Sequence, residues 1–302
     1  MRLATTTGDA KELTRDPFEA VSIVSEGGFK HIDLSLYTMD SLDNAFMKDG
    51  WEDYTLRLKA HAESLGCDFV QCHAPGSFNP FEQDAEKRER LINATKRSIE
   101  VCSLLGIKNN VLHTGWMQGI TREDCFKENL SFLRNFLDTA EKCGVNLLIE
   151  NSTRVNMGEM YHFYRGSTMR EFIEYASHPL IHACWDVGHA HLEHSNYDDI
   201  VDLADELYAL HIHDNRNGKD EHLLPYSGTI NMDEIIHALI KTGYKGYFTF
   251  ECEWLIFDSR YRKQFVADDR LFKPSREVFV AAENLRYAVG KHFLSSYNIF
   301  ED

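Results

Sequence analysis

An acidic residue and three histidines lie close together in the segment CWDVGHAHLEH, residues 184–194. Asp186 is followed by His189, His191 and His194, and an apolar run, LIHACW, leads into the segment. Carboxylate oxygens and imidazole nitrogens bind divalent metal ions and transfer protons. The segment therefore predicts either one part of a metal site or a polar loop that is rich in histidine.

Acids and histidines also end the neighbouring apolar segments. Six successive predicted strands end in such a residue: His73, His113, Glu150, Asp186, His211 and Glu251. One histidine alone would usually be structural, and Glu150 or Asp186 alone could cap the helix that follows. Six coincidences at one edge are a poor explanation, and an unpaired buried carboxylate costs several kcal/mol. A cation shared by these side chains explains the pattern more simply. Mixed oxygen and nitrogen ligands favour Mn²⁺ or Zn²⁺ and permit Co²⁺ or Mg²⁺.

A second signal lies in the polar segment after residues 207–214. Asp220 and His222 form a D-x-H pair there. Such a pair is weak evidence alone, but with His189 it would supply three ligands to an additional ion. The sequence thus allows one to three ions.

Eight apolar segments alternate with amphipathic segments along the whole chain. The predicted strands are 2–7, 29–36, 67–74, 109–115, 145–151, 180–188, 207–214 and 246–253. The predicted helices are 17–27, 51–66, 84–106, 122–144, 168–177, 197–203, 232–243 and 274–293. This alternation predicts an α/β protein with the (β/α)₈ TIM barrel fold, whose active sites lie at the carboxyl ends of the strands. We expect a single domain over 1–302, with a C-terminal extension (255–302) that forms a rim loop and a closing helix.

The composition limits the classes of binding partner that we expect. Lys and Arg number 32 against 48 for Asp and Glu, a net charge of −16, which disfavours nucleic acid as a partner. No apolar run reaches the ~20 residues of a membrane helix, and the first residues lack a secretory signal. Seven cysteines without a CxxC pair suggest reduced thiols. We therefore expect a cytoplasmic enzyme with no membrane partner.

Several motifs together resemble the xylose isomerase-like TIM barrels. They are HAPG, LHTG, IEN, WDVGHAH, LHIHDN, DEHLLPYSGTINMDEIIHAL and GYKGYFTFE, and the resemblance covers residues 1 to about 254. This superfamily includes sugar phosphate isomerases and epimerases and the AP endonuclease family 2. The resemblance implies carbohydrate metabolism or, in the alternative branch, hydrolysis of abasic DNA, with a divalent metal as cofactor.

The epimerase branch of the family implies one metal ion. Its four ligands would be Glu150, Asp186, His211 and Glu251. His211 matches better than His213, because the family pattern places an acid three residues after the histidine, as Asp214 is here. The resemblance further implies that Glu150 and Glu251 are the catalytic acid and base. They would transfer a proton through a metal-stabilised enediolate.

Three residues are predicted to bind substrate. His189 matches a histidine that contacts substrate in the epimerases. Arg216 lies near a substrate-binding arginine of that branch, although its offset from His211 is one residue short. Trp116, near the predicted rim, could pack against a sugar ring.

The endonuclease branch of the family implies three zinc ions. His73, His113 and Glu150 would hold the first, and the four epimerase-type ligands would hold the second. His189, Asp220 and His222 would hold the third. All nine positions are present, which supports a zinc-dependent phosphodiester hydrolase, whereas the net charge opposes it.

Three functions therefore remain open. A metal-dependent isomerase or epimerase acting on a small sugar or polyol is preferred. The alternatives are an endonuclease IV-like AP endonuclease and a metal-enolate lyase or dehydratase acting on a glycoside or inositol-type substrate. Homo-oligomers are compatible with each of them.

Overall fold

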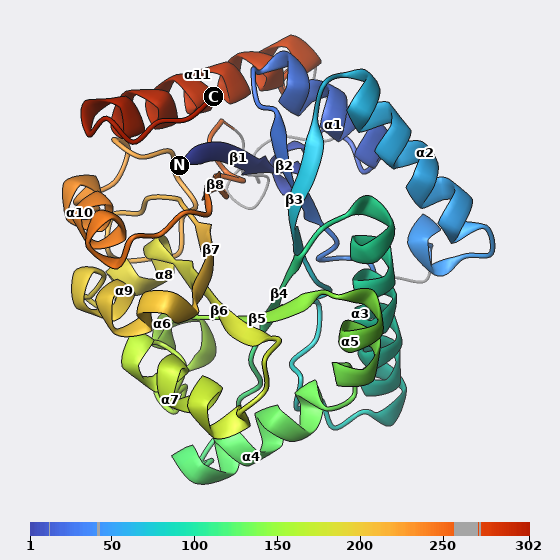
Figure 1. The fold of residues 1–302 in the computed structure, drawn as a ribbon, viewed down its shortest axis with the longest axis vertical. Coiled ribbons are helices and arrows are strands. Elements are labelled where there is room, and N and C mark those ends of the chain that lie inside the picture. The colour runs from blue at the N-terminus through green and yellow to red at the C-terminus, as the bar shows by residue number, and fades with distance from the viewer. Residues whose placement is uncertain (12, 41–42, 257–270, 272) are drawn as a thin grey trace.

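Eight parallel strands form the centre of the molecule in the computed structural model (Figure 1). The structure describes residues 1–302 except 12, 41–42, 257–270 and 272. The strands are β1 (Arg2–Thr6), β2 (His31–Ser35), β3 (Asp68–His73), β4 (Asn109–His113), β5 (Asn146–Glu150), β6 (Ile181–Asp186), β7 (Leu207–His211) and β8 (Tyr247–Phe250). Their order is β7-β6-β5-β4-β3-β2-β1-β8. The ring closes where Ile212 pairs in parallel with Phe250. The predicted barrel is confirmed.

Helices surround the strands in Figure 1 and cover the outer face of the barrel. Those longer than four residues are α1 (Pro17–Glu26), α2 (Trp51–Ser64), α3 (Ala85–Leu105), α4 (Arg122–Leu133), α5 (Leu137–Cys143), α7 (Gly166–Ala176), α8 (Val187–Leu192), α9 (Tyr197–Leu203), α10 (Met232–Thr242) and α11 (Arg276–Ser296). The closing helix predicted near the C-terminus is α11. The predicted rim loop lies mostly outside the described residues.

Two predictions of secondary structure were wrong. The single helix expected over 122–144 is two helices, because the Asn135 side chain donates to the carbonyl oxygens of Ser131 (3.2 Å) and Phe132 (2.8 Å) and ends α4. The residues after Asp186, expected to form a polar loop, form the short helix α8. Asp186 caps this helix by accepting from the backbone N–H of His189 at 2.6 Å.

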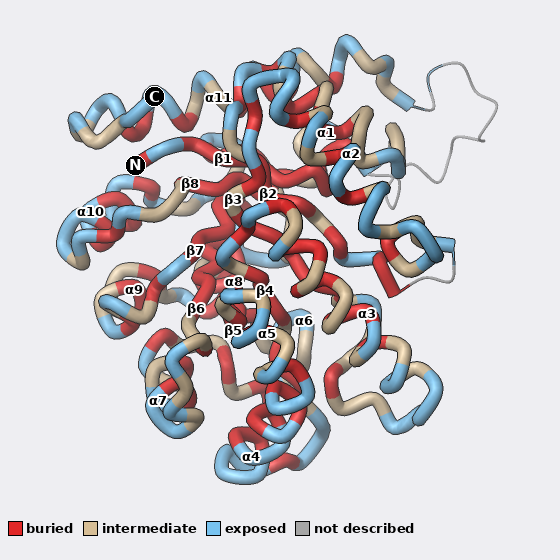
Figure 2. The backbone as a smooth tube through the Cα atoms, turned by 45° about the vertical axis from the view of Figure 1, so that its right-hand side comes forward, coloured by how far each residue is buried: buried red, intermediate tan, exposed pale blue. Residues whose placement is uncertain are grey.

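An apolar layer inside the barrel supports the predicted ligands. Val111, Leu148, Cys184 and Ala209 form one buried cluster. Each lies two residues before a predicted ligand on β4 to β7. Side chains two residues apart on a strand point to the same face, so the ligands lie above this layer, at the barrel mouth. Figure 2 shows the buried strands at the centre and the exposed outer faces of the helices.

A buried ion network joins α11 to the first strand. Arg286 is 2% exposed and contacts the carboxylates of Asp9 and Glu283, and it donates to Thr5 Oγ1 at 3.1 Å. Replacing Arg286 with alanine should lower the free energy of unfolding by about 3–5 kcal/mol, because two buried carboxylates lose their cation. Urea denaturation measures the loss. Arg276→Ala, at the half-exposed start of α11, removes solvent-accessible ion pairs with Glu19 and Glu26 and should cost no more than about 1 kcal/mol. Equal losses in the two variants would contradict the prediction.

Candidate metal centre and active site

A cavity of about 380 Å³ lies at the carboxyl ends of the strands. Seven predicted ligands line it: His73, His113, Glu150, His189, Asp220, His222 and Glu251. Tyr37, Phe78, Trp116 and Trp254 add aromatic walls. A polar floor beneath apolar walls is typical of a small-molecule site.

The four ligands predicted for the central metal come together. Ligand atoms of Glu150, Asp186, His211 and Glu251 all lie within 4.8 Å of one another. The Nδ1 atom of His211 lies 2.6 Å from Glu150 Oε1 and 3.4 Å from Glu251 Oε2. Its Nε2 atom faces the Gln71 side-chain amide at 2.9 Å. His211 therefore turns Nδ1 toward the two carboxylates, and Gln71 fixes the ring from behind.

Asp186 both caps a helix and belongs to the central ligand group, which are the two roles that the sequence allowed. Its Oδ1 atom caps α8, and its backbone is held by Asn151, whose Oδ1 accepts from the Asp186 N–H at 2.6 Å and whose Nδ2 donates to the Asp186 carbonyl at 2.9 Å. Its Oδ2 atom lies 3.0 Å from His213 Nε2, and one of its carboxylate oxygens lies within 4.8 Å of the other three central ligand atoms. The cap thus orients a carboxylate that also faces the centre.

A second ligand group shares Glu150. The Nε2 atoms of His113 and His73 lie 3.0 and 3.4 Å from Glu150 Oε2. This oxygen is buried and has no hydrogen-bond partner. An orphaned buried carboxylate oxygen that faces two imidazoles fits a divalent cation, which would satisfy all three groups.

Three histidines are locked in the orientation that metal binding requires. The Nδ1–H of His73 donates to the carbonyl oxygen of Ala74 at 2.8 Å, that of His189 to Asn151 at 3.0 Å, and that of His222 to Glu251 at 3.0 Å. A carbonyl oxygen only accepts, so the proton of each neutral ring is on Nδ1. Each Nε2 lone pair is then free to face the cavity, which is the usual arrangement of a metal-ligating histidine.

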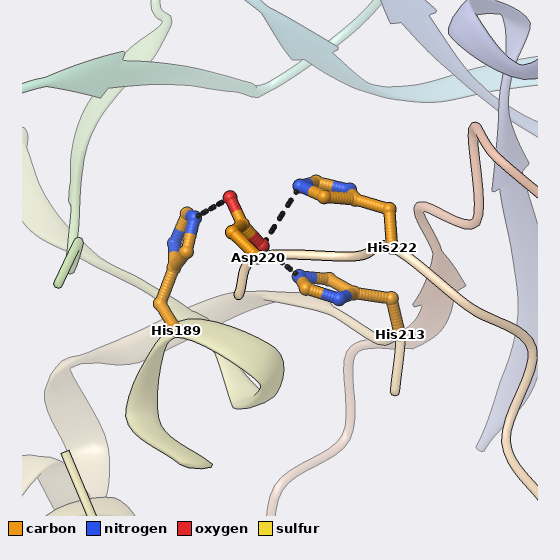
Figure 3. A group of neighbouring side chains, drawn as sticks. All are labelled: His189, His213, Asp220 and His222. Carbon is orange, nitrogen blue, oxygen red and sulfur yellow. Dashed lines mark hydrogen bonds and ion pairs between the residues drawn. The ribbon is translucent and has the colours of Figure 1, made fainter. Parts of the chain in front are cut away.

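The third predicted group also assembles and includes one residue more than expected. His189, Asp220 and His222 lie together, and His213 completes the set (Figure 3). The family pattern favoured His211 over His213 as a ligand, so His213 was not predicted. A signal was available: residues two apart on a strand point to the same face, so both side chains of HIH face the barrel mouth.

Burial and opposite charges shift the pKa values in this region. Burial alone would lower the pKa values of His73 and His189. The Glu150 carboxylate instead raises the pKa of His73 to about 9. The Asp186 and Asp220 carboxylates raise the pKa of His189 to about 10. Burial would raise the pKa of Glu150, but His211 and the other histidines hold it well below its usual range. The metal-free centre therefore holds protons where a cation would otherwise lie.

Metal affinity should accordingly rise with pH. The folded pKa values of about 9 and 10 lie above the ordinary value near 6.5. Protonation therefore stabilises the metal-free fold fully below that value, and this contribution is lost as the pH rises through 9 to 10. A cation must displace these protons. Calorimetric titration of metal-free protein with Mn²⁺ at about pH 6 and about pH 8 should give tighter binding at the higher pH. Equal affinity at both would contradict this assignment.

The predicted substrate residues lie in different places. His189 and Trp116 line the cavity. Arg216 is exposed, pairs with Glu221 at 2.8 Å and is not among the lining residues. Its role in substrate binding stays a prediction. Lys11 was not predicted as a site residue, but it lines the cavity and contacts Glu253 and the ring of Trp254.

The fold and the grouped ligands define a (β/α)₈ barrel with a candidate metal centre at its mouth. The family described as xylose isomerase-like TIM barrel matches residues 21–269, and the chain belongs to this family. No helix among the described residues is long and apolar enough to span a bilayer.

The chain is also similar to individual proteins. An uncharacterised protein, y4fM, of Sinorhizobium fredii (strain NBRC 101917 / NGR234) is 29% identical over 263 residues, which cover 77% of this chain and 79% of that protein. A D-tagatose 3-epimerase-like protein superposes with a TM-score of 0.75 at 17% identity, covering 99% of this chain and 98% of the other. The IOLI protein with a bound zinc atom superposes with a TM-score of 0.74 at 18% identity, covering 98% of this chain and 99% of the other. At these identities the superpositions show the shared fold alone.

Proposed function

We propose that the protein is a divalent-metal-dependent isomerase or epimerase of a small sugar or related polyol. One observation carries the proposal: Glu150 and Glu251 meet at one ligand group on the floor of the cavity. Two carboxylates placed there could remove and return a proton on a bound substrate. The fold shared with a D-tagatose 3-epimerase-like protein supports the same class of reaction.

The ligand set fits a hard or borderline divalent ion such as Mn²⁺ or Zn²⁺. Three carboxylates and one imidazole offer oxygen and nitrogen atoms that lie within 4.8 Å of one another. When bound, the ion would act as a Lewis acid that polarises a substrate carbonyl and so acidifies the neighbouring C–H.

The side chains of the protein would transfer the proton and hold the substrate. One of Glu150 and Glu251 takes the proton from the carbon beside the carbonyl, and the other returns a proton to the same or a neighbouring carbon. His189 reaches the cavity with its Nε2 atom and would hold a substrate oxygen. The Trp116 ring would pack against an apolar sugar face and restrict water.

Hydrogen exchange with solvent tests this proposal directly. Purified protein with Mn²⁺ or Zn²⁺ is incubated in deuterated water with a panel of ketoses and aldoses. Deuterium is expected at a carbon beside the carbonyl of at least one sugar, and it should be absent when EDTA is added. No incorporation anywhere in the panel would contradict the proposal. Loss of water from the substrate, seen in the product mass, would indicate the lyase or dehydratase alternative instead.

A second candidate is a zinc-dependent hydrolase that cleaves DNA at abasic sites. The observation that favours it is that both additional ligand groups assemble beside the central one. The net charge of −16 opposes tight binding to a polyanion. Incision of an abasic oligonucleotide by the zinc-loaded protein, abolished by chelation, would replace the isomerase proposal. Intact oligonucleotide would remove this candidate.

A further inference from the structure

We propose that Asp33, a buried carboxylate inside the barrel, is a positioning residue that holds His211 in the tautomer needed for metal binding. Its carboxylate would accept from the Nε2–H group of His211 and so leave the Nδ1 lone pair for the ion. The inference rests on the central ligand group of the proposed function, but not on the identity of the substrate. Asp33 was not predicted as a site residue, and it is not among the residues that line the cavity.

Asp33 lies in the closed layer beneath the ligands, in the middle of β2. It pairs with Gln71 on the neighbouring strand β3, and the two residues are 0% and 3% exposed. Gln71 lies two residues before His73 and so points to the same face of its strand. Paired residues of neighbouring strands share a face of the sheet, so Asp33 also points into the barrel, below the ligands.

Asp33 lacks a hydrogen-bond partner among the described residues, although both of its carboxylate oxygens are buried. Such a carboxylate is strongly destabilising unless a donor or a cation compensates it. The group that faces it is the imidazole of His211, whose Nε2 atom lies 3.8 Å from Asp33 Oδ2. A small shift would turn this approach into a hydrogen bond once Nε2 carries a proton.

The position of the His211 ring proton decides whether that bond can form. The amide nitrogen of Gln71 lies 2.9 Å from Nε2 and can only donate, so Nε2 accepts and the proton is on Nδ1. This Nδ1–H group donates to Glu150 Oε1 at 2.6 Å. An imidazole that binds an ion through Nδ1 carries its proton on Nε2 instead. The Gln71 amide nitrogen cannot accept from that group, whereas the Asp33 carboxylate can.

Asp33 would give His211 a stronger partner than the other oriented histidines have. His73, His189 and His222 donate their Nδ1–H groups to neutral backbone carbonyls. A carboxylate partner stabilises the required tautomer more strongly and raises the basicity of the ligating nitrogen. The Asp33 charge would therefore strengthen the bond between His211 and the central ion, and Asp33 would gain the hydrogen bond that it lacks.

Metal affinity and fold stability should respond differently when the Asp33 charge is removed. Calorimetric titration should show about 10–100-fold weaker Zn²⁺ binding in Asp33→Asn, in the binding event that His211→Gln also weakens. In EDTA, Asp33→Asn should unfold at an equal or higher urea concentration than the wild type, because an unpaired buried charge is gone. Thr249→Val, a buried change in the same layer, should leave zinc affinity unchanged. Unchanged zinc affinity in Asp33→Asn, or no zinc binding by the wild type, would overturn the proposal.

A double variant separates action through His211 from the simple attraction between a carboxylate and a cation. Adding Asp33→Asn to His211→Gln should weaken the remaining zinc binding by less than about twofold, because the histidine through which Asp33 acts is gone. A larger further loss would mean that Asp33 acts on the ion by its charge alone. Gln71→Met tests the neighbouring amide, and a greater loss of affinity than in Asp33→Asn would make Gln71 the partner of His211. Either result would overturn the proposal.

Nuclear magnetic resonance of the zinc-saturated protein reads the tautomer of His211 without any turnover. With ¹⁵N-labelled histidine, we expect an Nε2–H proton of His211, assigned by its absence in His211→Gln. This proton should shift upfield in Asp33→Asn, because its hydrogen bond to a charged acceptor is lost. The same position in both proteins would overturn the proposal, even if His211→Gln no longer binds zinc. A lack of deuterium exchange into sugars would count against the isomerase and leave this result unaffected.

Discussion

Glu150→Gln is expected to reduce proton exchange with substrate by at least about 10³-fold and to lower the metal content of the protein. General acid–base catalysis alone contributes about 10²–10⁴-fold. Glu150 also belongs both to the central ligand group and to the group with His73 and His113: its Oε1 atom faces His211 at 2.6 Å and its Oε2 atom faces His113 at 3.0 Å. Deuterium incorporation and elemental analysis of the purified variant measure both effects.

Two further variants test whether these effects are specific to the two ligand groups that share Glu150. Glu251→Gln changes only the central ligand group, so it should lose activity while the group of His73, His113 and Glu150 stays intact. Glu123→Gln, on the exposed face of α4, should behave as the wild type. Activity of Glu150→Gln within about tenfold of the wild type would exclude it as an acid or base in this reaction.

The sequence was informative about the barrel and its ligands for one physical reason. Each parallel strand is buried on both faces, so an acid or histidine at its end stands out against a continuous apolar run. Five predicted strand ends, from His73 to His211, are the last residues of their strands, and Glu251 follows β8 directly. Because the strands are parallel, those ends meet at one mouth.

The features that were not predicted from the sequence depend on contacts between segments that are distant along the chain. Helix α8 contains six residues, including a glycine, and its start depends on the Asp186 cap. Such a helix has too few residues for a clear hydrophobic period. His213 lies with His189, Asp220 and His222, and its ring fits there because Gly188, on the neighbouring helix α8, has no side chain. The spacing of residues within one segment of the sequence cannot predict a contact between two segments.

The loop that carries Asp220 and His222 depends on Asp214. This residue is 1% exposed, and its Oδ1 atom accepts from the N–H groups of Asn215 (2.8 Å) and Ile230 (3.0 Å), while Oδ2 accepts from Gly228 (3.0 Å). One carboxylate therefore holds both ends of the loop. Hydrogen bonds to a charged group contribute about 1.5–3 kcal/mol each.

Asp214→Ala should consequently lower the free energy of unfolding by about 3 kcal/mol or more, because one buried and two partly buried N–H groups lose their charged acceptor. Urea denaturation gives this value, and Asp49→Ala, at an exposed position, should change it by less than about 0.5 kcal/mol. Gly228→Ala should imitate the effect without removing the acid, since its Cβ atom would lie 2.2 Å from Asp214 Oδ1. A loss below about 1 kcal/mol in Asp214→Ala would mean that the loop is held by other contacts, because the three bonds would then contribute almost nothing.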